Sequence, residues 1–185
     1  MDFKVLLIYP NQRGMNMLPP AIGLLSSILK EDGNDVELFD TTYYEKLDES
    51  DNAEIDSDHI KTEKLMARPY KMPNEITLMT TNVFDDFLTK VESFGPDLLA
   101  LSCTEDMFEL GVQLLEKVKH HKILTIAGGV FPTFAPNQVI AKESVEMICV
   151  GEGESALLQL CDVLHSGTNI ESVPNIWFKR NGSII

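Results

Sequence analysis

The sequence has few positive charges and no long hydrophobic run. Its 15 lysine and arginine residues are outnumbered by 29 aspartate and glutamate residues, which gives a formal net charge of -14. Nucleic acids and anionic membranes are bound through clustered basic side chains, so both are excluded as general partners. No apolar stretch approaches the roughly 20 residues of a membrane-spanning helix. We therefore expect a cytoplasmic protein with a small neutral or zwitterionic partner.

Cysteine and histidine are also scarce, and neither type is spaced as in a metal site. Cys103, Cys149 and Cys161 fit no disulfide framework and no C-x-x-C pair, so we interpret each as a small buried hydrophobic residue. The histidines have no acidic or cysteine partner at ligand spacing, and we interpret them as surface residues: His59, His120, His121 and His165.

The phosphate-binding motifs of common nucleotide sites are missing. Residues 9–14 read YPNQRG, which lacks the G-x-G-x-x-G of a dinucleotide site, and no Walker loop is present. A phosphoacceptor receiver domain needs an aspartate at the end of its third strand, where this chain has Ser102. A flavin mononucleotide site remains an alternative, although its phosphate loop is usually rich in serine and threonine.

Five short apolar runs predict the strands of a sheet. The runs at 5–8, 98–101, 123–127 and 147–150 are nearly continuous in apolar residues, which is typical of parallel strands covered on both faces. The run at 36–39 alternates with polar residues and therefore predicts an edge strand.

Amphipathic repeats between these runs predict helices. Apolar residues recur at spacings of three and four over 22–29, 107–118 and 156–164, and Gly33 and Gly167 mark two helix ends. The alternation predicts an α/β fold, with a doubly wound five-stranded parallel sheet in the flavodoxin-like (Rossmann-like) order 2-1-3-4-5.

Two segments depart from this alternation. Residues 41–82 have no hydrophobic period and are interpreted as an insertion after the second strand, either a partly ordered lid or a mobile excursion. Residues 171–185 predict a hairpin with Asn181 and Gly182 in its turn. We expect residues 1–170 to form one domain and residues 171–185 to begin a hairpin or linker to a further domain.

Loops after the parallel strands converge at one edge of such a sheet, which is where ligands bind. The chain places small residues in these loops, at 102–104, 128–129 and 151–153, and no general base stands beside a nucleophile. Adjacent glycines at a strand end indicate a close approach of a backbone or a ligand. The alternatives are a simple tight turn at the glycines and helix capping by Ser102 and Thr104.

Five blocks of sequence carry a family resemblance: KVLLIYP, LPPAIGLLSSILKEDGNDVELFD, PDLLALSCT, AGGVFPTFAPNQV and ICVGEGESALLQL. In this order they resemble the N-terminal cobalamin-binding domain of radical S-adenosylmethionine enzymes. The nearest branch is the one named for anaerobic magnesium-protoporphyrin monomethyl ester oxidative cyclase, which also includes methyltransferases. The resemblance covers the chain outside the insertion.

The resemblance implies a site for cobalamin. Gly128 and Gly129 would be bare to admit its dimethylbenzimidazole tail, Ser102 and Thr104 would offer hydroxyls to the tail, and the residues after Gly129 would flank the corrin ring. The implied cofactor-binding residues are Pro10, Asn11, Gln12, Ser102, Thr104, Gly128, Gly129, Val130, Phe131, Pro132, Gly151, Glu152 and Gly153.

Two departures from related cofactor motifs refine this expectation. The D-x-H-x-x-G motif that supplies a histidine to cobalt is absent, so we expect no histidine lower ligand and the loop of residues 11–17 against the lower face. The C-x-x-x-C-x-x-C motif of the iron-sulfur cluster is absent too, so the cluster and S-adenosylmethionine would belong to a downstream barrel domain. We expect a cobalamin module of an oxidative cyclase or methyltransferase; the alternative is a degenerate domain that binds no cofactor.

Overall fold

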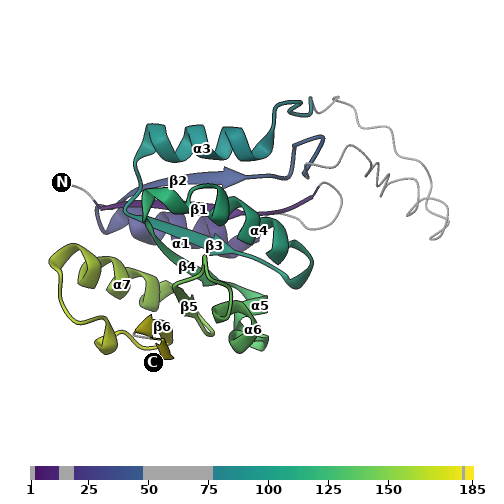
Figure 1. Ribbon diagram of the computed structural model, residues 1–185. Helices are drawn as coiled ribbons and strands as arrows, with labels where there is room; N and C mark the ends of the chain where they lie inside the picture. The colour runs from purple at the N-terminus through teal and green to yellow at the C-terminus, as the bar shows by residue number, and fades with distance from the viewer. Residues whose placement is uncertain (1–2, 13–18, 48–76, 181) are drawn as a thin grey trace.

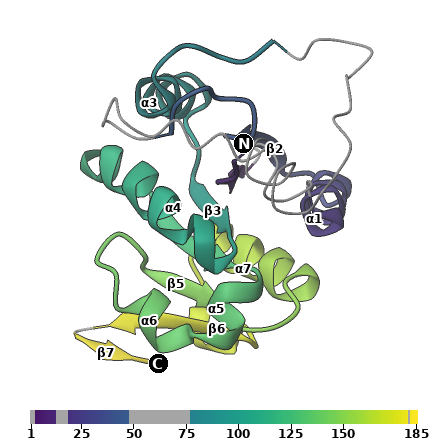
Figure 2. The ribbon, with the colours of Figure 1, turned by 90° about the vertical axis from the view of Figure 1, so that its right-hand side faces the viewer.

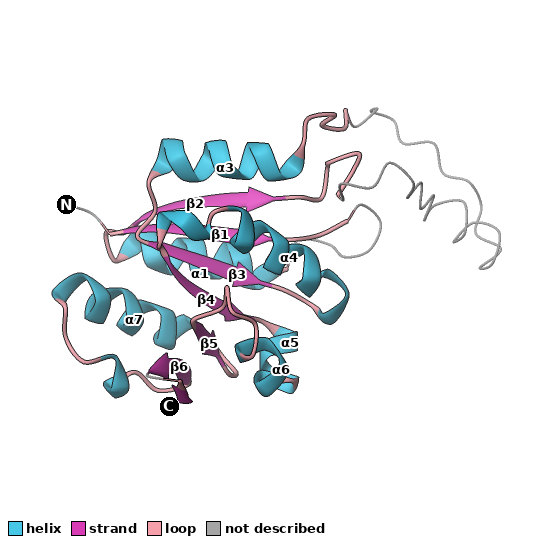
Figure 3. Ribbon diagram, viewed as in Figure 1, coloured by secondary structure: helices cyan, strands magenta, loops and turns pink. Residues whose placement is uncertain are grey.

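The fold is a single sheet with helices on both faces (Figure 1, Figure 3). The computed structural model describes residues 3–12, 19–47, 77–180 and 182–185. Within them the sheet has seven strands, in the order β2-β1-β3-β4-β5-β6-β7. In chain order the strands are β1 (Lys4–Tyr9), β2 (Asp35–Asp40), β3 (Leu98–Ser102), β4 (Leu124–Gly128), β5 (Met147–Cys149), β6 (Ile176–Arg180) and β7 (Ser183–Ile184).

The helices divide between the two faces of the sheet. One face is covered by α1 (Pro20–Glu31) and α7 (Glu154–Ser166), and the other by α3 (Val83–Phe94), α4 (Glu105–Lys117), α5 (Val130–Phe134) and α6 (Pro136–Ile140). Figure 2 shows α3 and α4 to one side of β3 and α1 to the other. No helix in the described part of the chain is long and apolar enough to span a membrane.

Successive residues of each inner strand point to opposite faces, so both faces of the sheet are buried. Leu6 and Leu99 pack under α3 and α4, whereas Val5 and Leu98 pack under α1 and α7. This burial on two sides explains why the strands read as continuous apolar runs.

The predicted parallel order 2-1-3-4-5 is confirmed, with β2 at the edge of the sheet. The five predicted parallel strands are all present, and the C-terminal hairpin adds two antiparallel strands to the same sheet. β6 pairs antiparallel with β5 and β7 pairs antiparallel with β6. Ile176 and Phe178 of β6 are buried in the core. The hairpin itself is confirmed, while the domain boundary after residue 170 stays a prediction.

Helix α3 was not recognised in the sequence, although its period was present. Phe84, Phe87, Val91 and Phe94 are buried at spacings of three and four. The insertion follows β2, as predicted, and α3 comes after it. The described ends of the insertion are joined by backbone hydrogen bonds around Tyr44 and Met79, and residues 48–76, with the acidic patch, lie outside the described residues.

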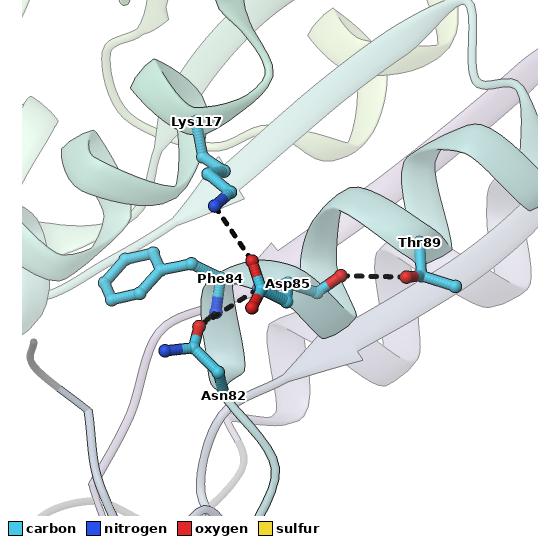
Figure 4. A network of polar contacts seen from close by, with 5 residues as sticks. All are labelled: Asn82, Phe84, Asp85, Thr89 and Lys117. Atoms are coloured by element: carbon cyan, nitrogen blue, oxygen red, sulfur yellow. Dashed lines mark hydrogen bonds and ion pairs between the residues drawn. The ribbon is translucent and has the colours of Figure 1, made fainter.

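Polar contacts fix the start of α3 and tie it to α4 (Figure 4). The side chain of Asn82 accepts hydrogen bonds from the backbone N–H groups of Phe84 and Asp85, at 2.9 and 3.1 Å. Lys117 of α4 forms an ion pair with Asp85 at 2.9 Å, and the Thr89 hydroxyl donates to the Asp85 carbonyl. Asn82 therefore satisfies two N–H groups that a helix start leaves without partners.

We predict that Asn82→Ala lowers the free energy of unfolding by about 1 kcal/mol, because two backbone donors lose their acceptor. Lys117→Gln is the control, since an exposed ion pair contributes little and the change should stay within about 0.5 kcal/mol. Urea denaturation followed by circular dichroism measures both. Equal effects of the two substitutions would contradict the prediction.

Candidate functional site

A cavity of about 330 Å³ opens at the carboxyl edge of the sheet, between α1 and α7. We call it the α1–α7 cavity. Its floor is formed by one residue from each of four parallel strands: Leu7, Ala100, Ile126 and Cys149. Its walls are formed by Ala21 and Leu25 of α1 and by Leu157 of α7. Floor and walls are therefore almost entirely apolar.

The rim of the cavity is built from the loops that follow β3, β4 and β5. It comprises Ser102, Gly128, Gly129, Val130, Thr133, Phe134, Gly151, Glu152, Gly153 and Glu154. The loops after β4 and β5 are tied together by Thr133, whose hydroxyl donates to the Gly129 carbonyl at 2.8 Å and accepts from the Gly151 N–H at 3.0 Å.

The loop after β3 is bound to the same rim through backbone hydrogen bonds. The Cys103 N–H donates to the Gly128 carbonyl at 3.2 Å, and the Phe131 N–H donates to the Cys103 carbonyl at 3.4 Å. The three loops therefore form one connected frame around the mouth of the cavity.

Gly128 and Gly129 are subject to different constraints. Gly129 has a φ of 102°, and a Cβ there would lie 3.1 Å from the Cys103 carbonyl oxygen, so its backbone alone excludes a side chain. Gly128 has no such φ, and its Cβ would meet only Cys149 Cβ at 3.8 Å. Gly128 lies on the same face of β4 as Ile126, so a side chain there would extend into the cavity.

Two apolar residues of α5 are exposed at the mouth. Val130 and Phe134 are 61% and 82% exposed and both line the cavity. Exposed apolar groups beside a cavity indicate a ligand or partner surface. Phe131 and Pro132 point elsewhere: Phe131 packs on Phe108 with ring centroids 5.1 Å apart, and Pro132 is buried.

The structure brings seven of the thirteen predicted site residues around the cavity: Ser102, Gly128, Gly129, Val130, Gly151, Glu152 and Gly153. Phe131, Pro132, Pro10, Asn11, Gln12 and Thr104 do not line it. The floor and wall residues were missed, because an apolar residue at a cavity and one in the core read alike in a sequence. Thr133 and Phe134 lie within the block AGGVFPTFAPNQV, so the sequence could have predicted them as site residues too.

The residues after β1 lie near the end of β2 and under α4. Asn11 is buried, its N–H donates to the Thr41 hydroxyl at 2.8 Å, and its side-chain amide donates to Thr42 at 2.9 Å. Pro10 is close to Gly111 of α4. Residues 13–17 of the loop predicted to face the lower side of cobalamin lie outside the described residues.

Thr104 occupies the N-cap position of α4, but its side chain makes no capping hydrogen bond. Its hydroxyl oxygen is buried and has no hydrogen-bond partner among the described residues. The capping alternative therefore does not account for Thr104. A role toward a ligand remains a prediction.

The thiol that lines the cavity, Cys149, is not reactive at neutral pH. The Cys149 thiol donates to the Glu152 carbonyl at 3.8 Å, and burial together with the charges of Glu154 and Glu152 raises its pKa to about 11. It therefore stays protonated. All three cysteines are free and buried, as the sequence predicted. The described part of the chain contains no cluster of three metal-ligating side chains.

The cavity mouth lies at the carboxyl ends of the parallel strands, whereas the described histidines lie at their amino ends. His120 and His121 form a short 3-10 helix, η1 (Lys119–His121), just before β4 begins. His165 is in the last turn of α7 and contacts Phe3, ahead of β1, with ring centroids 6.1 Å apart. These three are exposed, as predicted, whereas His59 lies outside the described residues.

We predict that Gly129→Ala lowers the free energy of unfolding by about 2 kcal/mol, because alanine is strained at this φ and its Cβ meets the Cys103 backbone. Gly128→Ala is the matched control one residue away, and it should leave stability unchanged or raise it by up to about 1 kcal/mol. Urea denaturation of both variants tests this. A neutral Gly129→Ala would disprove the assignment of backbone strain.

With this geometry in view, comparison with known proteins gives a consistent result. Residues 71–161 match the family model of the B12 binding domain. An uncharacterized methyltransferase of Pyrococcus horikoshii is 24% identical over 104 residues, which are 55% of this chain and 23% of that protein. The anaerobic magnesium-protoporphyrin IX monomethyl ester cyclase of Synechocystis is 33% identical over 64 residues, which are 34% of this chain and 13% of that protein.

Two solved structures share the fold over the whole chain. The radical S-adenosylmethionine methyltransferase TsrM from Kitasatospora setae, with cobalamin and a 4Fe-4S cluster bound, superposes with a TM-score of 0.71 at 15% identity, covering 30% of that chain. The cobalamin-dependent S-adenosylmethionine radical enzyme OxsB, with aqua-cobalamin and S-adenosylmethionine bound, gives 0.67 at 20% identity, covering 22% of that chain.

The match to the B12 binding domain therefore covers just under half of the chain, and the fold is similar to part of each of these two cobalamin-bound radical S-adenosylmethionine enzymes. The likeness to the cyclase is distant and covers a third of the chain. The chain spans less than a third of each of these four proteins.

Proposed function

We propose that this domain binds cobalamin with the nucleotide tail in the α1–α7 cavity and the corrin ring over the loops at the carboxyl edge of the sheet. The observation that carries the proposal is the apolar cavity of about 330 Å³ that opens beside Gly128, where strand β4 ends. Open α/β sheets bind their ligands at this edge. The match of residues 71–161 to the B12 binding domain supports the same ligand.

The chemistry of the cavity suits the dimethylbenzimidazole end of the cofactor. This base is a flat, uncharged aromatic group, and the residues that would enclose it include Ala100, Ile126 and Leu157. Burying an aromatic group of 150–200 Å² contributes about 4 kcal/mol. The missing side chain of Gly128 leaves the entrance open to the chain of atoms that joins the base to the corrin.

The exposed apolar residues of α5 provide the second part of the proposed site. Val130 and Phe134 stand at the mouth, where the edge of a corrin ring would cover them. Phe134 is held in place because Thr133, its neighbour, bonds to both adjoining loops. Binding would therefore bury apolar surface that the free domain leaves in water.

We also propose that the cofactor has no histidine as its lower ligand. His120, His121 and His165 all lie at the opposite edge of the sheet from the cavity mouth. The sequence has no D-x-H-x-x-G motif after the first strand. If the tail base is held in the cavity, it would not serve as a ligand of cobalt.

The domain would act as the cofactor holder of a larger radical S-adenosylmethionine enzyme, of oxidative cyclase or methyltransferase type. Bound cobalamin supplies a cobalt centre that can carry a methyl group or an electron. This chain has no C-x-x-x-C-x-x-C motif, so the iron-sulfur cluster and S-adenosylmethionine would be held by a downstream barrel domain. The residues described here would bind and orient the cofactor and exclude water from its tail.

We predict that the purified protein retains hydroxocobalamin after desalting, and that Gly128→Leu reduces the retained corrin absorbance at least tenfold. The new side chain would occupy the cavity without backbone strain, since only Cys149 Cβ lies within 4 Å of the Cβ position. Gly23→Leu is the matched control, because Gly23 is an exposed residue of α1 that does not line the cavity and has open space around it.

The visible spectrum after gel filtration measures retention, and circular dichroism confirms that each variant is folded. Retention by Gly128→Leu equal to that of the wild type would place the tail elsewhere. A folded wild-type protein that retains no corrin would favour the alternative of a domain without a cofactor.

For the lower ligand, we predict that the reduced Co(II) form of the complex shows no nitrogen superhyperfine splitting in its electron paramagnetic resonance spectrum. A histidine or benzimidazole nitrogen on the cobalt axis would produce this splitting. If splitting appears and is lost when all four histidines are changed to glutamine, the proposal of a histidine-free lower face is wrong. If it persists in that variant, the tail base itself is the ligand and does not occupy the cavity.

A further inference from the structure

The interior of the α1–α7 cavity has very few free hydrogen-bonding groups. Leu7, Ala100 and Ile126 on the floor offer only hydrocarbon, and their strand N–H and C=O groups belong to the sheet. Leu25 and Leu157 on the walls are apolar as well. A guest that enters this space therefore exchanges water for hydrocarbon on most of its surface.

Two of the polar side chains at the cavity, Thr133 and Cys149, are engaged with the protein. The Thr133 hydroxyl donates to the Gly129 carbonyl and accepts from the Gly151 N–H. The Cys149 thiol donates to the Glu152 carbonyl and remains protonated at neutral pH. Ser102, at the end of β3, is left as the hydroxyl that a guest could reach.

Charge at the rim restricts which part of a guest can enter. Glu152 and Glu154 both line the cavity, and none of the lining residues described here is basic. A phosphodiester would be repelled by these carboxylates, so it would stay outside. An uncharged ring system is therefore the part of a cobamide that fits inside.

Resting on the proposed function, we propose that the cavity selects among cobamides by their lower base: it favours an apolar benzimidazole over a purine such as adenine. The two bases are bicyclic and similar in size, so shape alone separates them little. Adenine adds an exocyclic amine and further ring nitrogens, each of which needs a hydrogen-bond partner once it leaves water. Apart from the Glu152 and Glu154 carboxylates, the cavity offers only the Ser102 hydroxyl as an unengaged polar side chain.

The expected selectivity is about tenfold to a hundredfold in affinity, the range in which an apolar pocket discriminates between a hydrocarbon group and a polar isostere. Leu25 is the position at which this preference can be changed. It is a half-buried residue of α1, and its Cδ2 lies 3.8 Å from the position of a Cβ on Gly153, so its tip reaches the cavity rim. Glutamine there would bring a donor and an acceptor to the guest.

The experiment is a spectrophotometric titration of the full chain with cobalamin and with adeninylcobamide that carry the same upper ligand. Wild type, Leu25→Gln and Leu24→Gln are compared. Leu24 is the matched control, an exposed neighbour on the same helix that does not line the cavity. The two cobamides differ in how readily their own base leaves cobalt. That difference belongs to the ligands, so it cancels when the affinity ratio is compared between proteins.

We expect Leu25→Gln to reduce the ratio of cobalamin to adeninylcobamide affinity at least threefold and Leu24→Gln to leave it unchanged. A ratio that Leu25→Gln leaves unaffected in a folded variant, or that Leu24→Gln changes equally, overturns the selectivity. If neither cobamide binds the wild type, the proposed function fails instead, so the two failures are distinguishable.

Discussion

The position of the site depends on the backbone turn at Gly129. Its φ of 102° and its close approach to the Cys103 backbone bring the loop after β4 against the loop after β3. From this turn α5 begins, and Thr133 one turn later connects to Gly151 in the loop after β5. A side chain at Gly129 would separate these loops, and the exposed Val130 and Phe134 would lose their place at the cavity mouth.

The α1–α7 cavity lies where the sheet carries small side chains. Under α3 and α4 the core contains many aromatic rings: Phe39, Phe84, Phe87, Phe94 and Phe108. Under α1 and α7 the carboxyl edge carries Ala100, Gly128 and Cys149 instead, with Gly153 at the start of α7. Small residues on four adjoining elements leave a volume that the helices do not fill. The cavity is thus a consequence of side-chain choice within an otherwise regular fold.

Much of this could be predicted from the sequence, and the remainder could not for physical reasons. Continuous apolar runs gave the parallel strands, since burial on both faces removes alternation. The rim followed from the convergence of loops at one edge. The floor could not be predicted, because Ile126 has the same apolar neighbours along the chain whether a helix or a cavity covers it. The sequence also could not show that Val130 lines the cavity while Phe131 packs against the core. The direction in which α5 leaves the sheet depends on the positive φ of Gly129. The spacing of apolar residues in α3, by contrast, was sufficient to predict a helix there.

These features suit the α1–α7 cavity to the proposed role of holding a cofactor. A catalytic domain needs a group whose pKa lies near the working pH, yet the Cys149 thiol is held protonated by burial, with its pKa raised to about 11. Glu152 is exposed and Glu154 is half-buried, and both line the cavity. A site lined mainly by hydrocarbon, with a fixed rim, is suited to holding and orienting a guest. Such a lining suits a domain that must hold a reactive cofactor without reacting with it.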